Sequence, residues 1–327
     1  MTLLDSRLFD ALCCPADGAW PLKRDDDHRL RNTRTGELRC PECDRPFAVR
    51  DGLVSFLSAQ ELTEQDHRER AMRDDESAWY DAMFEGYTDA VEVPTAVRRV
   101  GRPAGPVLDA GCGTGRITEA LLSLGQAVLA VDYSETCLRR MLGRVGDAPV
   151  LAVQSDLRAL PVRAGAMAAA TCIEVYSQFR TADRAVIISE LARVLARDAV
   201  LSISAFNYNL LFRAWHARGN AGAREGEHML GGDYYYFRFT KDEFRSELAA
   251  CFDVEEVTGV RNIPARTVAG ALHRVGLRRA GDRFLDFMVA RGHKADFALE
   301  RLPAVADRIG FFWQARARKA SMTTRSR

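Results

Sequence analysis

Three glycines at alternate positions, directly after an apolar strand, constrain this chain more than any other feature of its sequence. The expected strand Pro106–Ala110 runs into Gly111-Cys112-Gly113-Thr114-Gly115, and a helical pattern begins at Arg116. Glycine is needed where a backbone adopts positive φ or passes close to a ligand, and the first turn of a helix leaves N–H groups unpaired. The dinucleotide pattern G-x-G-x-x-G has a different spacing, and Asp109 would repel a pyrophosphate but can hold a ligand ammonium group. The segment therefore indicates a ligand-binding turn in an α/β sheet.

The pattern around this turn alternates between apolar strands and amphipathic helices, which is typical of a parallel sheet covered by helices. The further strands that we expect are 127–132, 150–154, 168–175, 199–205, 252–260 and 311–318, and the helices between them are 116–124, 135–144, 183–195 and 241–250. Residues 267–308 have the spacing of amphipathic helices. The fold class is therefore α/β, with no internal repeat.

Acidic residues stand at the ends of three further strands. Asp132, followed by Tyr133, comes nineteen positions after Gly113, where a carboxylate can accept hydrogen bonds from the two hydroxyls of a ribose. Asp156, followed by Leu157, ends the next strand and can accept from an adenine amino group, and Glu174 ends the strand after that. Because these strand ends share one edge of the sheet, the sequence predicts a bound nucleoside there.

The motifs around these residues are also similar to those of a known protein family. The stretches LDAGCGTGR, VDYS, QSDLRALP and TCIEVYSQF in residues 106–205 resemble the class I S-adenosylmethionine-dependent methyltransferases, in the branch near the ubiquinone and menaquinone methyltransferases. The resemblance implies a seven-stranded, doubly wound, Rossmann-like sheet with an antiparallel last strand, over residues 101–327. It implies that Asp109 and the glycines Gly111, Gly113 and Gly115 face the methionine part of S-adenosylmethionine. It also implies that Asp132 holds the ribose, and that Asp156 and Leu157 flank the adenine.

The first 58 residues contain four of the eight cysteines and short β-like segments. Cys40 and Cys43 form a C-x-x-C knuckle, and Cys14 and Asp17 repeat that spacing, so that three thiolates and one carboxylate can surround a zinc ion. The stretch is similar to the zinc-ribbon activator proteins of tRNA and translation-factor methyltransferases, from which it departs by having Asp17 in place of a second cysteine. We expect residues 1–58 to form a small β-rich, zinc-ribbon-like domain that is structural or orients the substrate, and 59–100 to form a helical linker or cap.

Two insertions in the catalytic domain are candidates for substrate contact. Residues 207–239 are rich in aromatic side chains, which suits either a lid over a flat substrate or a hydrophobic anchor to the sheet. Two histidines of this insertion, His216 and His228, and Tyr176 beside the strand ends are candidate general bases. The basic insertion 264–308 can contact an anionic substrate or RNA, or can form a solvated helix pair packed on the domain.

Charge and composition limit the remaining functions. The whole chain has a net charge of +1, but residues from Arg261 onward include fifteen basic and five acidic side chains. No run of eighteen apolar residues and no secretory signal pattern occur, and the cysteine distribution does not suit a disulfide framework, so a cytoplasmic location is expected. We expect a methyltransferase acting on a small molecule, such as a secondary metabolite or a quinone-like compound. The alternative is an RNA methyltransferase, of the ribosomal RNA type, that uses the ribbon and the basic C-terminal part to bind RNA.

Overall fold

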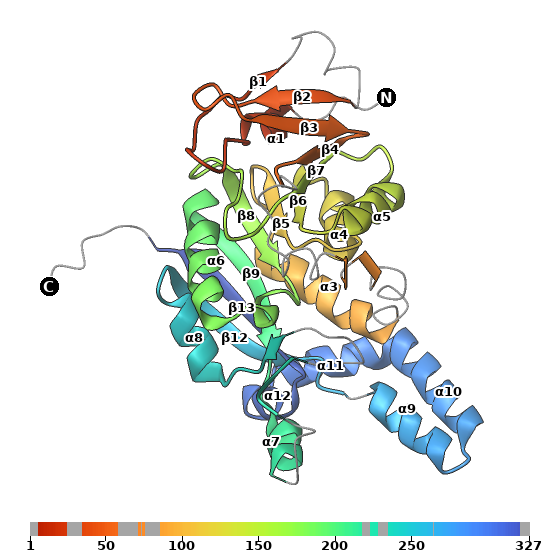
Figure 1. Cartoon of the computed structure of the whole chain (residues 1–327). Coiled ribbons are helices and arrows are strands. Elements are labelled where there is room, and N and C mark those ends of the chain that lie inside the picture. The colour runs from red at the N-terminus through yellow and green to blue at the C-terminus, as the bar shows by residue number, and fades with distance from the viewer. Residues whose placement is uncertain are drawn as a thin grey trace, which may run out of the picture.

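The computed structural model describes residues 6–24, 35–57, 71–72, 74–75, 86–217, 223–227, 235–263 and 265–320. Within these residues, one large sheet forms the centre of the molecule and helices cover both of its faces (Figure 1). The part of the sheet formed by residues 107–319 has the order β7-β6-β5-β8-β9-β13-β12. Its strands are β5 (Val107–Ala110), β6 (Val128–Asp132), β7 (Val150–Gln154), β8 (Met167–Cys172), β9 (Leu195–Phe206), β12 (Phe252–Val260) and β13 (Phe312–Lys319).

The predicted seven-stranded arrangement is confirmed for this part of the sheet. Strands β5 to β9 are mutually parallel, and the last strand β13 is antiparallel to both of its neighbours, β9 and β12. Because β12 therefore runs in the same direction as β9, the segments that follow β5, β6, β7, β8, β9 and β12 all leave the sheet at its carboxyl edge.

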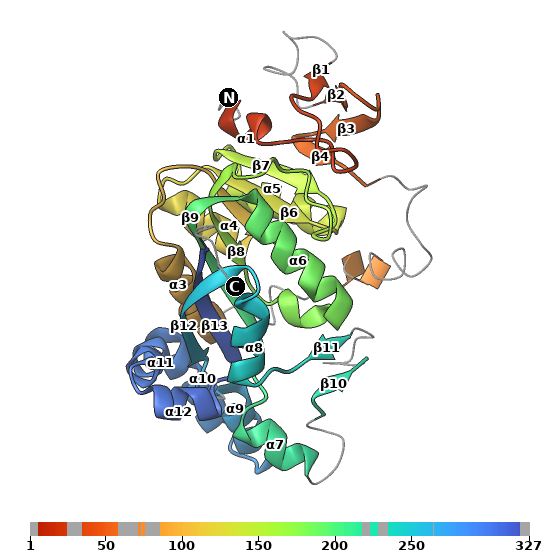
Figure 2. The same cartoon turned by 90° about the vertical axis from the view of Figure 1, so that its left-hand side faces the viewer.

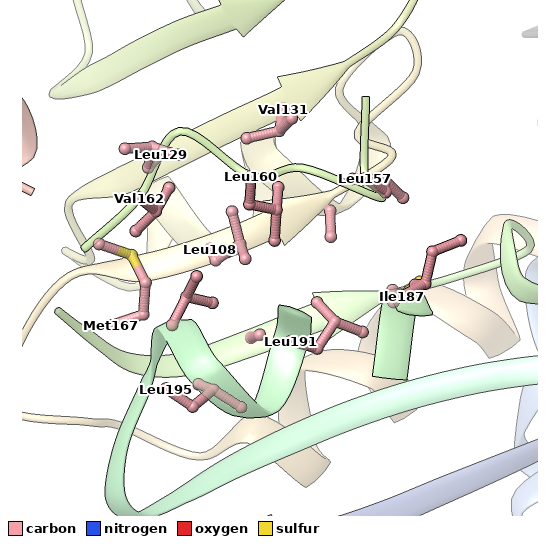
Figure 3. Packing of buried hydrophobic residues seen from close by; sticks show 14 of the residues in the cluster. Leu108, Leu129, Val131, Leu157, Leu160, Val162, Met167, Ile187, Leu191 and Leu195 are labelled. Carbon is pink, nitrogen blue, oxygen red and sulfur yellow. The ribbon is translucent and has the colours of Figure 1, made fainter. Parts of the chain in front are cut away.

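The two faces of the sheet bury alternate residues of each strand, as the two-residue period of a strand requires. Leu108, Leu129 and Leu151 face α6 (Thr181–Val194) and α8 (Lys241–Leu248), and Figure 3 shows Leu108 and Leu129 in the same apolar cluster as Leu191 of α6. The neighbouring valines Val107, Val128 and Val150 face α3 (Tyr87–Val100), α4 (Arg116–Ser123) and α5 (Glu135–Val145). Helix α8 has Thr240 as its N-cap, and Thr240 exchanges hydrogen bonds with Glu243 in a capping box.

The sheet has eleven strands rather than the seven predicted, because the N-terminal region adds four. Strands β1 (Lys23–Arg24), β2 (Gly36–Arg39), β3 (Pro46–Arg50) and β4 (Leu53–Ser55) form an antiparallel ribbon, and a short helix α1 (Ser6–Asp10) precedes them. Strand β4 then pairs in parallel with β7, so that Leu53 to Ser55 lie beside Ala152 to Gln154. The ribbon thus continues the seven-stranded part of the sheet (Figures 1 and 2).

Further contacts join the ribbon to the segment that follows β7. The N–H of Cys13 donates to the carbonyl of Pro161 at 3.0 Å, and the N–H of Arg163 donates to the carbonyl of Ala11 at 2.8 Å. Ser55 Oγ lies 2.8 Å from Gln154 Oε1 and donates to it. The ribbon therefore contacts the stretch that carries Asp156 and Leu157.

The insertions lie at the carboxyl edge of the sheet, at the end of the molecule opposite the ribbon (Figure 1). The first follows β9 and contains α7 (Leu210–His216) and the small hairpin of β10 (Glu225–Gly226) and β11 (Tyr236–Phe237). The second follows β12 and is helical as predicted. It contains α9 (Ala265–Arg274), α10 (Arg278–Phe287), the π-helix Met288–Gly292, α11 (His293–Glu300) and α12 (Pro303–Ile309). Of the predicted helical stretch 59–100, the structure describes α3; most of the remainder lies outside the described residues.

Candidate active site and candidate metal centre

The glycine loop crosses the ends of β5 and β6. The N–H groups of Gly111 and Cys112 both donate to the carbonyl of Val131, at 2.8 and 3.0 Å. Gly111 has a φ of +76°, and a Cβ there would lie 2.4 Å from Val175 Cγ2, so that no larger residue fits. These contacts hold the loop against the end of β6, the next strand.

The structure brings Asp132 and Gly113 together. The N–H of Gly113 donates to Asp132 Oδ2 at 2.8 Å, and the N–H of Ser134 donates to Oδ1 at 2.9 Å, so that the carboxylate is fixed at the end of β6. Gly113 has a φ of +52°, and a Cβ there would meet no atom within 4 Å. Open space thus lies beside a partly exposed, oriented carboxylate, as a ribose would require.

Helix α4 begins at this loop without a side-chain cap. Its N-cap, Gly115, is left-handed and offers no side-chain acceptor to the first N–H groups. Uncapped N–H groups at the start of a helix attract a negatively charged group, such as the carboxylate of a methionine. The uncapped helix, the open side of Gly113 and the oriented Asp132 together fit S-adenosylmethionine.

Asp109 is buried and is bound by two hydroxyls. Thr118 donates to its Oδ2 at 2.6 Å, and Thr171 donates to its Oδ1 at 2.7 Å. Burial raises the pKa of Asp109 to about 6, although the two hydroxyl hydrogen bonds oppose that shift. These contacts give Asp109 a role in joining β5, α4 and β8, and its predicted contact with a ligand ammonium stays a prediction.

The residues predicted to flank the adenine occupy the segment after β7. Asp156 accepts from the guanidinium of Arg158 at 2.6 Å and from the N–H of Arg158 at 2.8 Å. Leu157 is buried in the apolar core, and the carbonyl of Tyr133 accepts from Gln154 Nε2 at 3.2 Å. Asp156 therefore shapes its own loop, and its contact with the adenine remains a prediction.

Glu174 belongs to a buried ionic cluster that the sequence analysis did not identify. Arg116 of α4 donates to Glu174 at 3.2 Å and to Asp89 of α3, and it lies 3.9 Å from Glu92. Arg261, after β12, lies 3.5 Å from Glu92. Burial raises the pKa of both Glu92 and Glu174, and Arg116 opposes the shift in each case.

Glu174 follows β8 at the carboxyl edge of the sheet, and its predicted place at the cofactor stays a prediction. Glu174 has a φ of +61°, a left-handed conformation that is rare for a residue with a side chain and is often found at functional sites. The one sequence signal was Arg116 itself, since an arginine at the start of a buried helix needs acidic partners. No spacing rule identifies Asp89 or Glu92 as those partners, because the cluster joins four separate elements.

The three candidate general bases have different positions. The hydroxyl of Tyr176 is buried and donates to Glu247 of α8 at 2.5 Å, and burial raises the pKa of Tyr176, so that these contacts favour a structural role. His216 is exposed on α7, with its Nδ1 at 2.7 Å from the hydroxyl of Tyr208. His228 lies outside the described residues.

The aromatic side chains of the first insertion attach it to the sheet. Phe212 packs edge-on against Phe311 with ring centroids 5.5 Å apart, and Arg238 lies over the rings of Phe212 and Tyr236 at 4.1 and 4.4 Å. The sequence allowed this segment to be either a lid over a flat substrate or a hydrophobic anchor to the sheet. The contacts of Phe212 and Tyr236 are those of an anchor.

The four predicted metal ligands meet in the ribbon. One ligand atom from each of Cys14, Asp17, Cys40 and Cys43 lies within 4.8 Å of the others. The sulfurs of Cys14 and Cys43 are 3.7 Å apart, and two sulfurs about 2.3 Å from one tetrahedral zinc ion would be separated by roughly 3.8 Å. The N–H groups of Glu42 and Cys43 both donate to Cys40 Sγ at 3.4 Å, as expected for a knuckle that turns around a thiolate. The donor set therefore fits zinc.

A glycine loop after β5, a carboxylate at the end of β6 and a seven-stranded part whose last strand in the chain, β13, is antiparallel together define the class I methyltransferase fold. Comparison of the sequence with protein families agrees: residues 107–198 match the family described as a methyltransferase domain, and residues 5–52 match the family of Trm112p-like proteins. The chain is an S-adenosylmethionine-dependent methyltransferase that also carries a Trm112-like domain.

Solved structures similar to this chain have the same fold at low sequence identity. One is a complex of the Trm112 methyltransferase activator from Haloferax volcanii with a methyltransferase, with a TM-score of 0.54, 16% identity, and coverage of 78% of this chain and 99% of that one. Another is the [4+2]-cyclase SpnF, with a TM-score of 0.53, 15% identity, and coverage of 78% and 96%. A third is phosphoethanolamine N-methyltransferase 2 from Haemonchus contortus, with a TM-score of 0.50, 17% identity, and coverage of 76% and 58%. No curated protein matches the chain in sequence.

Proposed function

We propose that this methyltransferase acts on a small-molecule acceptor, such as a secondary metabolite or a quinone-like compound. The observation that supports the proposal is the position of both insertions. They follow β9 and β12 and lie at the carboxyl edge, where α/β sheets bind their ligands. A site that the chain covers with its own segments admits a small acceptor more readily than a folded polymer.

In this proposal the residues of the glycine loop and β6 bind and orient the cofactor. Asp132 accepts the ribose hydroxyls, and the uncapped start of α4 takes the carboxylate of the methionine part. S-adenosylmethionine supplies a methyl group that is already activated on a sulfonium. The remaining task of the chain is to align the acceptor with that methyl group, which can itself provide most of the rate enhancement.

We further propose that an acidic side chain of this buried cluster, Glu174 or Glu92, receives a proton from the acceptor. Both are buried, and Arg116 lies beside both of them. A raised pKa brings a carboxylate nearer to the range in which it can act as a base. We assign this role to Glu174, since it follows β8 at the same edge as Asp132.

The alternative acceptor is RNA, and the Trm112-like domain is the observation that favours it. The activator in the Haloferax volcanii complex has a similar domain as a separate chain. Against this alternative, the ribbon and the basic helices lie at opposite ends of the molecule, so that one short RNA segment cannot contact both (Figure 1).

Fractionation of methylated products tests both possibilities. Purified protein is incubated with methyl-labelled S-adenosylmethionine and cell extract, and the label is then measured separately in small metabolites, RNA and protein. Label in small metabolites that is lost in the Asp132→Ala variant supports the proposal. Label in RNA contradicts it and makes RNA the acceptor.

A further inference from the structure

Large apolar side chains are exposed mainly at one end of this molecule. Among the described residues, eleven large hydrophobic side chains are exposed, and nine of them belong to α7 or to the second insertion. The exceptions are Trp20 in the ribbon and Val186 on α6. The nine are Leu210, Leu211, Val268, Val275, Leu277, Phe287, Val289, Leu302 and Val305. Such a concentration marks an interaction surface rather than the usual scatter of single apolar residues.

The helical hairpin of α9 and α10 carries the most exposed part of this surface. Its turn includes Val275, which is 70% exposed, and Leu277, which is 53% exposed. Figure 1 shows the hairpin projecting from the body of the molecule. An open groove of about 880 Å³ runs along α10 and is lined by the apolar residues Leu277, Ala280, Phe284 and Phe287 and by three arginines.

The arginines around this groove have no acidic partner. In the part of the chain that the structure describes, Arg274, Arg278, Arg279 and Arg283 are exposed and form no ion pair, whereas Asp282 Oδ1 lies 2.9 Å from His273 Nε2.

Three other acids of the insertion are bound elsewhere, whereas a fourth, Asp286 on α10, is exposed. Asp296 is fully buried on Asn262, Glu300 pairs with Arg98, and Asp307 pairs with Lys241. The exposed charge at this end of the molecule is therefore mostly positive.

We propose that the α9–α10 hairpin docks this enzyme on an anionic lipid surface. Arginines beside exposed aliphatic side chains suit the boundary between anionic headgroups and acyl chains, where helices lie in the plane of the interface. No helix of the described residues is long and apolar enough to cross a bilayer. The interaction is therefore peripheral, with Val275 and Leu277 inserting and the arginines contacting the headgroups.

Two other occupants fit the same surface less well. An RNA would pair with the arginines but would leave Val275 and Leu277 in water. A second copy of this chain, bound through a two-fold axis, would place these unpaired arginines against each other. The lipid surface alone uses both the apolar and the cationic side chains.

Vesicle flotation tests the proposal on the full-length protein. Phosphatidylcholine vesicles are compared with vesicles in which part of the lipid is phosphatidylglycerol. We expect binding to the anionic vesicles, and a loss of roughly tenfold or more in partitioning for Arg278→Glu/Arg279→Glu, because each arginine near such a surface contributes a severalfold gain. The Leu277→Asp variant is expected to lose binding as well.

The control for the apolar substitution is Val186→Asp, since Val186 is 45% exposed on α6, away from the hairpin. It is expected to bind as the wild type does, and circular dichroism checks that every variant is folded. Absence of wild-type binding, or equal binding by the hairpin variants, overturns the proposal. So does a dimer that disappears in Leu277→Asp, or RNA binding that depends on the same arginines without vesicle binding.

Discussion

Asp132 is the residue on which cofactor binding depends most directly. It is fixed by two backbone N–H donors and faces the open side of Gly113. We expect Asp132→Ala to weaken S-adenosylmethionine binding by roughly 10- to 100-fold, because hydrogen bonds to a charged group are lost. Titration calorimetry measures the affinity. The control is Asp253→Ala, an exposed acid on β12; unchanged affinity in Asp132→Ala contradicts the assignment.

Asp109 gives the stability of the protein a definite pH dependence. Its pKa is about 6 in the folded protein, against 3.8 for a free side chain, so the folded state binds the proton more tightly. The contribution of this carboxyl to the free energy of unfolding is therefore fully present below about pH 4. It is lost as the pH rises through about 6.

The Asp109→Asn variant isolates this contribution, since asparagine does not titrate. We expect the free energy of unfolding of the wild type, relative to Asp109→Asn, to fall by up to about 3 kcal/mol between pH 4 and pH 7 and to be constant above that. Urea unfolding at a series of pH values measures it. A difference that does not change with pH, or that rises, shows that Asp109 is not buried as described.

The sequence predicted the residues that lie at the ends of strands. It did not predict side-chain contacts that depend on how the helices pack on the sheet. Asp132 and Gly113 were predicted together, because parallel strand ends must meet at one edge. The contacts of Tyr176 with Glu247 and of Arg116 with Glu92 were missed, since they depend on how helices α8 and α3 pack on the sheet. Periodicity predicts such helices but not which of their residues meet.

At the scale of elements, the metal centre of the ribbon joins two segments that are distant in the sequence. Cys14 and Asp17 follow α1, whereas Cys40 and Cys43 belong to the turn between β2 and β3. We expect purified protein to contain one zinc ion per chain, measured by mass spectrometry of the metal, and Cys43→Ser to lose it. Hydrogen exchange of β2 and β3 is expected to become faster in that variant.

The matched control is Cys251→Ser, at a half-buried cysteine outside the ribbon. Zinc content and exchange in this variant are expected to equal those of the wild type. Full zinc retention in Cys43→Ser would contradict the four-ligand centre.

The pairing of β4 with β7 could not be predicted from the sequence. Short β-like segments were expected in residues 1–58, but a strand of three residues such as β4 contains no information about its partner. The ribbon was therefore placed as a separate domain, and the eleven-stranded sheet became visible only in three dimensions.

For the whole molecule, the continuous sheet predicts a single cooperative unit. We expect differential scanning calorimetry to show one unfolding transition for the wild type. Val54→Pro is expected to split it in two, because proline at this fully buried position removes an N–H from the ladder with β7. Val54→Ala keeps that N–H and is expected to lower the temperature of the single transition without splitting it. Two transitions in the wild type would show that the ribbon unfolds independently.

The same pairing decides which sheet edges this protein presents to its neighbours. Without β4, the edge of the sheet would be β7, whose five residues are all buried and mainly apolar, and such an edge recruits strands from other molecules into aggregates. With the ribbon in place, the edge on that side is β1, which is two residues long and consists of Lys23 and Arg24. Short, charged edge strands resist further pairing, so the ribbon also protects the catalytic domain against aggregation.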